Sequence, residues 1–209
     1  MVSTRSGTKG HRVPRRTVLR VSTFLCAVAF AAWPALAQDR PLYVNRDFRF
    51  GVIFPGQPME RDIAYTTRTG DSVSAREFFI ERGDARYSVT IVQFATGPSV
   101  SRRTVEHAAE NLRRRGEIMF QAYANYDPGM PGRQLNIRET NGRQLRASVY
   151  MYDHRLYITE ASAEPGDVAA IQFEQSIMML EPDGTDADRS GIDFVFAVIG
   201  DVFRRILPD

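Results

Sequence analysis

The chain has 209 residues, of which 43% are hydrophobic and 25% are charged, and its formal net charge is +2. This composition excludes a disordered, a collagen-like or a multi-span membrane protein, and a single cysteine excludes a framework of disulfide bonds. The charge is unevenly distributed, because six of the 27 basic residues and none of the 25 acidic residues lie in residues 1–37. Residues 38–209 therefore hold 21 basic against 25 acidic residues, a net charge of −4.

The first 37 residues contain the three parts of a bacterial secretory signal peptide in order. A basic stretch up to Arg20 precedes an apolar run over residues 21–33, Pro34 interrupts this run, and small residues follow. We expect cleavage between Ala37 and Gln38. The apolar run is shorter than the ~20 residues that span a bilayer, which disfavours an uncleaved anchor. The expected location of the mature protein is the periplasm or the medium.

Two export routes fit this signal. Residues 15–20 read RRTVLR, which resembles the twin-arginine motif with Val18 where that motif usually has phenylalanine. A twin-arginine signal would mean that the protein crosses the membrane already folded. The alternative is an ordinary Sec signal in an arginine-rich sequence. On either route Cys26 lies in the segment that is removed, so the mature chain would have no thiol.

Residues 38–209 are long enough for one domain with a sizeable core. Apolar side chains, three of them phenylalanines, occupy every second position of residues 48–54 until Pro55-Gly56 stops the run, which predicts a strand. Turn residues at 69–71 and 83–84 separate further runs of strand character. The strands expected from these runs cover residues 61–67, 73–81 and 86–94.

The hydrophobic period then changes to that of a helix. Four apolar side chains recur at helical spacing ahead of Gly116, which is expected to be the C-cap. These side chains are Val105, Ala108, Ala109 and Leu112. Strands are expected again at residues 117–126, 133–140, 144–152 and 155–162. Asn141-Gly142 predicts a two-residue hairpin, and Asp153-His154 predicts a tight turn between the last two strands.

The C-terminal part predicts two more helices. The first runs from residues 165–167 to Leu180, with Ala169, Phe173 and Ile177 on the face of Leu180. Residues 181–191 are typical of a solvated acidic linker. Residues 192–209 place their apolar side chains on one half of a helical wheel, which predicts an amphipathic helix. The expected fold is α+β: residues 38–180 form a mainly antiparallel sheet flanked by two helices, and the amphipathic helix follows the linker.

Residues that carry chemistry are scarce in the mature chain. It has no cysteine and only two histidines, His107 and His154, so no set of metal ligands is predicted. It also lacks a glycine-rich phosphate loop and a nucleophile elbow. We therefore predict no catalytic residue, no metal and no cofactor. His107 is expected to face solvent on the first helix.

A cluster of arginines at residues 102–103 and 113–115 raises the question of a nucleic-acid partner. Glu106 and Glu110 lie one helical turn from several of these arginines, so pairing within the helix is favoured. The net charge of −4 on residues 38–209 and the export signal also argue against binding to a polyanion. No nucleic-acid partner is expected.

Three tyrosines form the strongest candidate ligand site. Tyr150, Tyr152 and Tyr157 are expected on the sheet face opposite Leu145 and Leu156. They either line a ligand cleft, with Asp153 orienting His154 as a general base, or lie under the C-terminal helix, which we favour. For Asp153 and His154 we favour a hairpin turn, because both residue types tolerate the left-handed conformation.

Several segments carry a resemblance to known proteins. The opening strand Phe48-Arg49-Phe50-Gly51-Val52-Ile53-Phe54-Pro55-Gly56-Gln57-Pro58 is the clearest of them. The others are Arg86-Tyr87-Ser88-Val89-Thr90, Pro131-Gly132-Arg133-Gln134-Leu135 and His154-Arg155-Leu156-Tyr157-Ile158. Over about residues 45–180 the chain resembles a family of small exported proteins from alphaproteobacteria with no assigned function. It is more distantly similar to the PsbP-like fold, an antiparallel sheet flanked by helices. Neither resemblance supplies catalytic residues.

These observations favour an exported, non-catalytic accessory or binding module. PsbP-like proteins commonly act as accessory subunits, so the resemblance implies the same role. The partner expected for the amphipathic helix at 192–209 is a protein or a membrane surface. The alternative is a small ligand-binding protein or enzyme that uses the face of Tyr150, Tyr152 and Tyr157 with Asp153 and His154.

Overall fold

The computed structural model describes residues 41–124 and 129–187. The expected signal peptide, its cleavage site between Ala37 and Gln38, and the expected helix at 192–209 lie outside these residues. Within them the chain forms ten strands and two helices. The expected α+β class with a mainly antiparallel sheet is confirmed.

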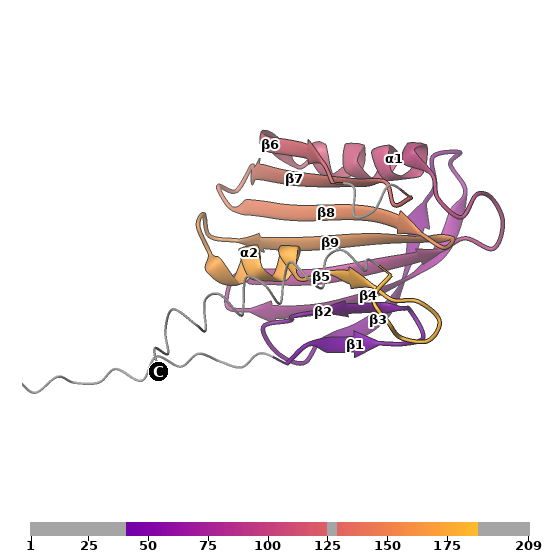
Figure 1. Ribbon diagram of the computed structural model, residues 1–209. Helices are drawn as coiled ribbons and strands as arrows, with labels where there is room; N and C mark the ends of the chain where they lie inside the picture. Colours follow the sequence, from indigo (N-terminus) through magenta and orange to yellow (C-terminus); the bar gives the residue numbers. More distant parts are fainter. Residues whose placement is uncertain (1–40, 125–128, 188–209) are drawn as a thin grey trace, which may run out of the picture. The chain divides into compact units, whose positions relative to one another are not determined.

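Seven strands form the larger sheet in the order β3-β4-β5-β9-β8-β7-β6, and every neighbouring pair is antiparallel (Figure 1). The first meander consists of β3 (Met59–Thr66), β4 (Ser72–Arg82) and β5 (Ala85–Gln93). The second consists of β6 (Gly116–Tyr123), β7 (Gly132–Glu139), β8 (Gln144–Tyr152) and β9 (Arg155–Ala163). The last strands of the two meanders, β5 and β9, pair with each other. The strands β3 and β6 are therefore the two edges of the sheet.

A smaller sheet consists of β1 (Tyr43–Asn45), β2 (Phe50–Val52) and β10 (Met178–Met179), with β2 in the middle. The expected strand over residues 48–54 is therefore too long. The reason is the turn between β1 and β2, where Arg49 adopts a φ of 54° and the backbone N–H of Phe48 donates to Asn45 Oδ1 at 3.0 Å.

The first helix, α1 (Arg102–Arg113), buries the four apolar residues expected on its inner face. Its N-cap is Ser101, whose hydroxyl accepts from the backbone N–H of Thr104 at 3.2 Å. The C-cap is Arg114, so the expectation for Gly116 is wrong. Gly116 instead begins β6, where a Cβ atom would lie 2.0 Å from the carbonyl oxygen of Arg138. The close approach of two strands therefore explains this glycine.

The second helix, α2 (Val168–Gln175), starts at the N-cap Asp167 and is shorter than expected. It ends because Ser176 turns the chain away: the Ser176 hydroxyl donates to the carbonyl oxygen of Phe173 and accepts from the backbone N–H of Ile53, both at 2.9 Å. The chain then continues into β10 beside β2. In the described part of the chain, neither helix has the length and apolar character needed to cross a membrane.

Alternating side chains divide the larger sheet into two faces with separate cores. We call them the α1 face and the α2 face, after the helix whose apolar residues join each core. The α2 face packs Tyr87, Tyr157 and Phe173 with residues of the small sheet. The α1 face packs Leu145, Val149 and Leu156 with α1. The expectation that Tyr150 and Tyr157 lie opposite these aliphatic residues is confirmed.

The hairpin between β7 and β8 has a longer loop than expected. The backbone N–H of Glu139 donates to the carbonyl oxygen of Arg143 at 2.8 Å, which leaves Thr140, Asn141 and Gly142 as a three-residue loop. Only Gly142 of these has positive φ, at 85°. A two-residue type I′ turn requires positive φ at both central residues. Asn141-Gly142 therefore does not form the expected two-residue hairpin turn.

The first residues of the expected acidic linker fold back on the domain. The backbone N–H of Glu181 donates to the carbonyl oxygen of Thr185 at 2.8 Å, and that of Ala187 donates to Met179 at 2.9 Å. The side chain of Asp183 accepts from the backbone N–H and the hydroxyl of Thr185. Residues 181–187 thus form a turn that extends the small sheet.

Candidate functional site

The tyrosine face expected to bind a ligand is filled by the domain itself. Tyr150 is 7% exposed and Tyr157 is 1% exposed, and both belong to the core of the α2 face. The Tyr157 hydroxyl donates toward the carbonyl oxygens of Phe48 and Arg49 at 3.4 and 3.3 Å. The Tyr152 hydroxyl donates to a carboxylate oxygen of Glu181. The small sheet and its following turn therefore occupy the space where a ligand would lie.

The pKa values of the three tyrosines reflect this packing. Burial raises the pKa of Tyr150 to about 12, and the nearby Glu174 adds to this effect. Burial, together with the bond to Glu181, raises the pKa of Tyr152 to about 12. Burial also raises the pKa of Tyr157. All three phenols therefore stay neutral at pH 7 and do not act as acids close to neutral pH.

Asp153 and His154 form the turn between β8 and β9, with φ values of 42° and 62°. The Asp153 carboxylate accepts from Arg49 Nη1 at 2.5 Å and Arg155 Nη1 at 3.1 Å, so it orients two arginines. The His154 backbone N–H donates to the carbonyl oxygen of Ser99 at 2.9 Å, and its buried Nδ1 has no hydrogen-bond partner among the described residues. This geometry supports a type I′ hairpin turn rather than a base held by Asp153.

His107 also differs from its expected position in solvent. It is half-buried on α1, where its Nε2 lies 3.2 Å from the carbonyl oxygen of Thr66 and its ring meets Tyr65 edge-on at 6.4 Å. Burial raises the pKa of Tyr65 to about 12. The two side chains lie beside an open groove of about 640 Å³.

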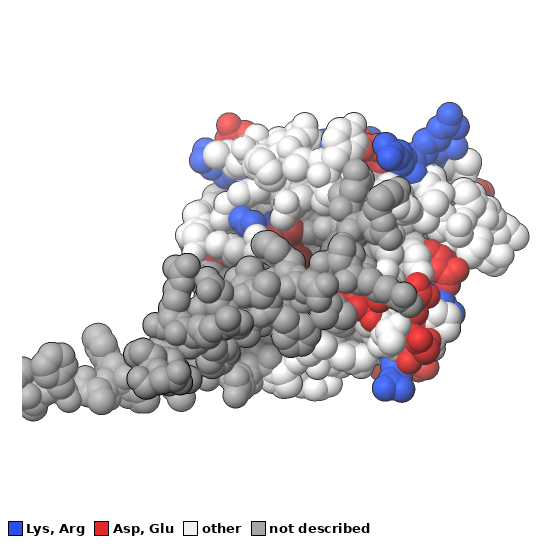
Figure 2. Space-filling view, viewed as in Figure 1, with Lys and Arg blue, Asp and Glu red and all other residues white. Residues whose placement is uncertain are grey.

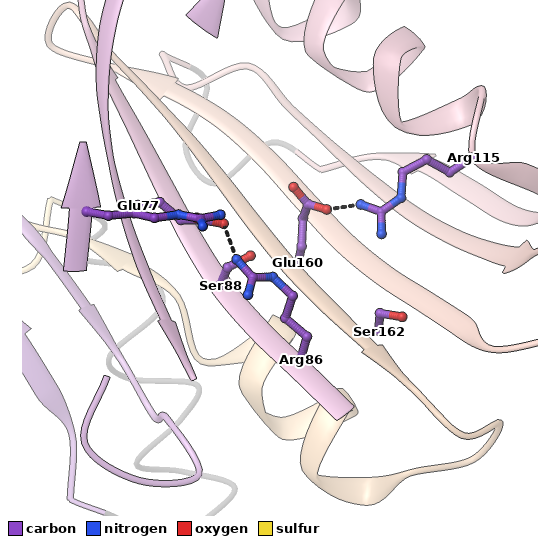
Figure 3. Close-up of a pocket in the computed structure, with 7 residues that line it drawn as sticks. Glu77, Arg86, Ser88, Arg115, Glu160 and Ser162 are labelled. Atoms are coloured by element: carbon purple, nitrogen blue, oxygen red, sulfur yellow. Dashed lines mark hydrogen bonds and ion pairs between the residues drawn. The ribbon is translucent and has the colours of Figure 1, made fainter. Parts of the chain in front are cut away.

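The strongest candidate site lies elsewhere, on the α1 face. A cavity of about 280 Å³ opens there, lined by charged side chains and serine hydroxyls without an apolar side chain. We call it the arginine–glutamate pocket, and its lining residues are Arg61, Glu77, Arg86, Ser88, Arg115, Glu160 and Ser162. Figure 3 shows that they come from neighbouring strands and from the chain beyond the end of α1.

The position of the pocket follows from the register of the sheet. The helix α1 contacts mainly β7 and β8, and the chain beyond its last turn brings Arg115 to the pocket. Beyond the helix, the α1-face positions are polar: Ser88 pairs with Glu160 across β5 and β9, and Arg86 pairs with Ser162. The sheet thus has apolar residues under the helix and polar residues where the helix does not reach.

One wall of the pocket is built around Glu77, whose side chain is only 9% exposed. Its carboxylate accepts from Arg61 Nε at 2.6 Å and from Arg86 Nη2 at 2.7 Å. Both guanidinium groups also stack on the ring of Phe79, at 4.9 and 4.6 Å from its centroid. Phe79 and Glu77 together hold the two arginines in fixed positions, because each guanidinium has both an ion pair and a stacking contact.

The opposite wall is built around Arg115. Its Nε and Nη2 donate to Glu139 Oε1 at 3.1 and 2.6 Å, and its Nη1 donates to Glu160 Oε2 (Figure 3). Burial raises the pKa of Glu160, whose side chain is 23% exposed; Arg115 opposes this rise, and Glu77 adds to it. Burial acts to lower the pKa of Arg115, but the two glutamates outweigh it and raise the pKa.

The two walls offer different groups to a ligand. Arg61 uses only its Nε in the described contacts, so both of its terminal nitrogens are available as donors, as are Arg86 Nε and the Ser88 hydroxyl. On the other side, Glu160 uses one oxygen for Arg115, and the other oxygen is available as an acceptor. Neither lining serine contacts a histidine in the described structure, so the pocket presents fixed charges rather than an activated nucleophile.

Sequence reasoning missed this pocket. Its charged residues other than Arg115 occupy ordinary polar positions of strands. The strongest signal was the cross-strand pair of Glu81 and Arg86, which has Glu77 and Ser88 on the same face of the sheet. Among the described residues, no group of three or more histidine, cysteine, aspartate and glutamate side chains is placed to hold a metal ion. Neither a protein-family model nor a curated protein matches the chain.

Proposed function

We propose that the protein is an exported, non-catalytic binding module that takes a small polar ligand into the arginine–glutamate pocket. The observation that carries this proposal is the pair of opposed walls, in which ion pairs and stacking hold donors on one side and an acceptor on the other. Export rests on the signal-like pattern of residues 1–37. The resemblance to exported alphaproteobacterial proteins and to the PsbP-like fold supports the accessory role.

The chemistry of the walls selects a zwitterion. A carboxylate or similar anion suits the terminal nitrogens of Arg61 and the Ser88 hydroxyl, because guanidinium groups bind planar anions with two parallel hydrogen bonds. An ammonium group of the same ligand suits the open oxygen of Glu160. The cavity of about 280 Å³ limits the ligand to the size of an amino acid or a comparable small molecule. An apolar ligand would find no matching wall.

A titration with three small probes tests this proposal. Glycine carries both charges, acetate carries only the anion, and methylammonium carries only the cation. The Nε–H resonances of Arg61 and Arg86 should shift with glycine at lower concentrations than with acetate, and hardly with methylammonium. Glu160→Gln should abolish the preference for glycine over acetate, whereas Arg138→Gln, an exposed arginine paired to Glu117 outside the pocket, should leave it unchanged. Equal responses to glycine and acetate in the unaltered protein would contradict a zwitterion site.

The wider arrangement of the chain is part of the same proposal. The two helices flank the larger sheet, and residues 192–209 form an amphipathic helix that binds a protein partner or a membrane surface. Deletion of residues 191–209 should remove partner or membrane association while the remaining domain stays folded. An insoluble or unfolded truncated protein would instead assign this segment to the core. Fractionation of expressing cells, with sequencing of the mature N-terminus, tests export and cleavage after Ala37.

A further inference from the structure

The edge strand β6 carries exposed apolar side chains. No described strand pairs with its outer side, so backbone N–H and C=O groups along it are open to a new strand. Ile118, Met119, Phe120 and Tyr123 are 42%, 47%, 52% and 69% exposed. In Figure 2 the upper rim, where β6 runs, is mostly uncharged between charged groups at its two ends.

The opposite edge of the same sheet is different. The strand β3 has Glu60, Arg61 and Asp62 in succession, all exposed. Charged residues on an edge strand oppose pairing with another strand. The strand β6 has a single charged residue, Glu117, which pairs with Arg138 of its own sheet at 3.2 Å. The edge at β6 therefore lacks the run of charged residues that the edge at β3 has.

We propose that β6 is the dimer interface of this protein: a second copy of the chain binds along it in antiparallel orientation, and the two larger sheets continue into one. The pairing is centred on Gln121. This register places Phe120 of each copy opposite Ala122 of the other, on the α2 face, and the two Gln121 amides opposite each other on the α1 face. Apolar residues meet apolar residues, and a polar residue meets itself.

The β-bulge in β6 supports a centre at this position. The register with β7 shifts between Ile118 and Phe120, which bends the strand there. The regular pairing that runs from Phe120 to Tyr123 is the straight part of the edge, and Gln121 lies within it. A foreign strand that paired along the whole of β6 would have to follow the bend, whereas the two-fold pairing of Phe120, Gln121 and Ala122 lies within the straight part of both copies.

The charges beside Gln121 also suit a second copy. Arg113 donates to the Gln121 side chain at 3.1 Å and pairs with Glu106 and Glu110 at 3.4 and 3.2 Å. A two-fold axis at Gln121 brings the Arg113–Glu110 pair of each copy toward that of the other. The two pairs then present opposite charges to each other, and each Arg113 keeps the glutamate partners of its own copy. The same symmetry closes the assembly at two copies, whereas pairing of β6 with β3 would build an open filament and bury the charges of β3.

Sedimentation equilibrium of protein purified from cells that express the full chain tests the dimer. The unaltered protein should be dimeric at micromolar concentrations. Phe120→Lys should weaken the dimer by about 30-fold or more, because a charge enters the centre of the interface. Met59→Lys is the matched control, since Met59 is equally exposed, at 56%, but lies on β3, and this variant should remain dimeric. A monomeric unaltered protein, a dimeric Phe120→Lys variant, or equal effects of the two lysines would overturn the proposal.

A cysteine at the two-fold axis gives an independent measurement that does not depend on the folding of Phe120→Lys. Residue 121 faces its own copy across the axis, at a distance between strands that a disulfide can bridge. Gln121→Cys should therefore form a covalent dimer under mild oxidation, whereas Met59→Cys should not. Circular dichroism of each variant verifies that it is folded. Failure of Gln121→Cys to cross-link faster than Met59→Cys would overturn the register and the interface with it.

Discussion

The two faces of the larger sheet are built from the same strands but differ in what covers them. On the α2 face, aromatic residues meet the small sheet and α2, and the space is filled. On the α1 face, α1 packs on β7 and β8, and past its last turn the strands present paired charges around a cavity. Alternate residues of one strand thus contribute to a filled core on one face and to an open pocket on the other. Stability and binding should therefore respond to substitutions on different faces.

The largest loss of stability should come from a substitution in the core of the α2 face. Phe173 is completely buried, with its ring centroid 4.9 Å from that of Phe54 and 5.4 Å from that of Tyr87. Phe173→Ala should lower the free energy of unfolding by about 3–5 kcal/mol, because it leaves a cavity in the core. Phe79→Ala removes a side chain of the same type from the α1 face, where Phe79 is only half-buried. This substitution should lower the free energy of unfolding clearly less. Urea unfolding of both variants measures the difference, and equal losses would erase the distinction between the faces.

The second largest effect should be a loss of stability at alkaline pH, caused by the buried Tyr150 on the α2 face. The pKa of Tyr150 is about 12 in the folded protein and about 10 in an unfolded chain, so the folded state retains the proton longer. The stability from the neutral phenol is present below pH 10 and is lost as the pH rises from 10 to 12, by about 2 kcal/mol. Tyr150→Phe should lose less stability across this interval. Parallel stability curves for the two proteins would show that burial of this phenol has no such effect.

The pocket should show a titration of the same sign at acidic pH. Burial raises the pKa of Glu160 above that of an unfolded chain, so the folded state binds its proton more readily. The stability that this proton brings is full below the ordinary glutamate pKa and is lost as the pH rises through the raised value. Compared with Glu160→Gln, the unaltered protein should therefore lose stability as the pH rises from 4 toward neutral, in the window above about 4.3. Thermal unfolding of both proteins over this range measures the difference, and a constant difference would contradict the assignment.

The strands were predictable because their signals are local. Alternation and turn residues marked β3, β4, β5, β7, β8 and β9 within a residue or two, and helical spacing marked the inner face of α1. The errors concern contacts between distant parts of the chain. The end of α2 depends on Ser176 meeting Ile53, and the role of Gly116 depends on Arg138. No local pattern contains these contacts.

The candidate site could not be predicted from the sequence for the same reason. Glu77 and Glu160 occupy polar strand positions that look like solvent-facing positions in a single sequence. They share a pocket only because β5 pairs with β9, a connection between two meanders that turn chemistry does not specify. The tyrosines, in contrast, were placed on the correct face, but the small sheet that covers them depends on β10 returning to β2.

The smallest expected effect on the free energy of unfolding concerns the turn at His154, which lies outside the arginine–glutamate pocket. His154 adopts a φ of 62°, which costs a residue with a side chain about 1 kcal/mol relative to glycine. If the residue serves only the hairpin, His154→Gly should raise the free energy of unfolding by about 0.5–1 kcal/mol and leave glycine binding unchanged. Arg49→Gly relieves a similar φ of 54° but removes the ion pair to Asp153, so it should give no net gain. Loss of glycine binding in His154→Gly would indicate that the functional site lies at this turn and not in the arginine–glutamate pocket.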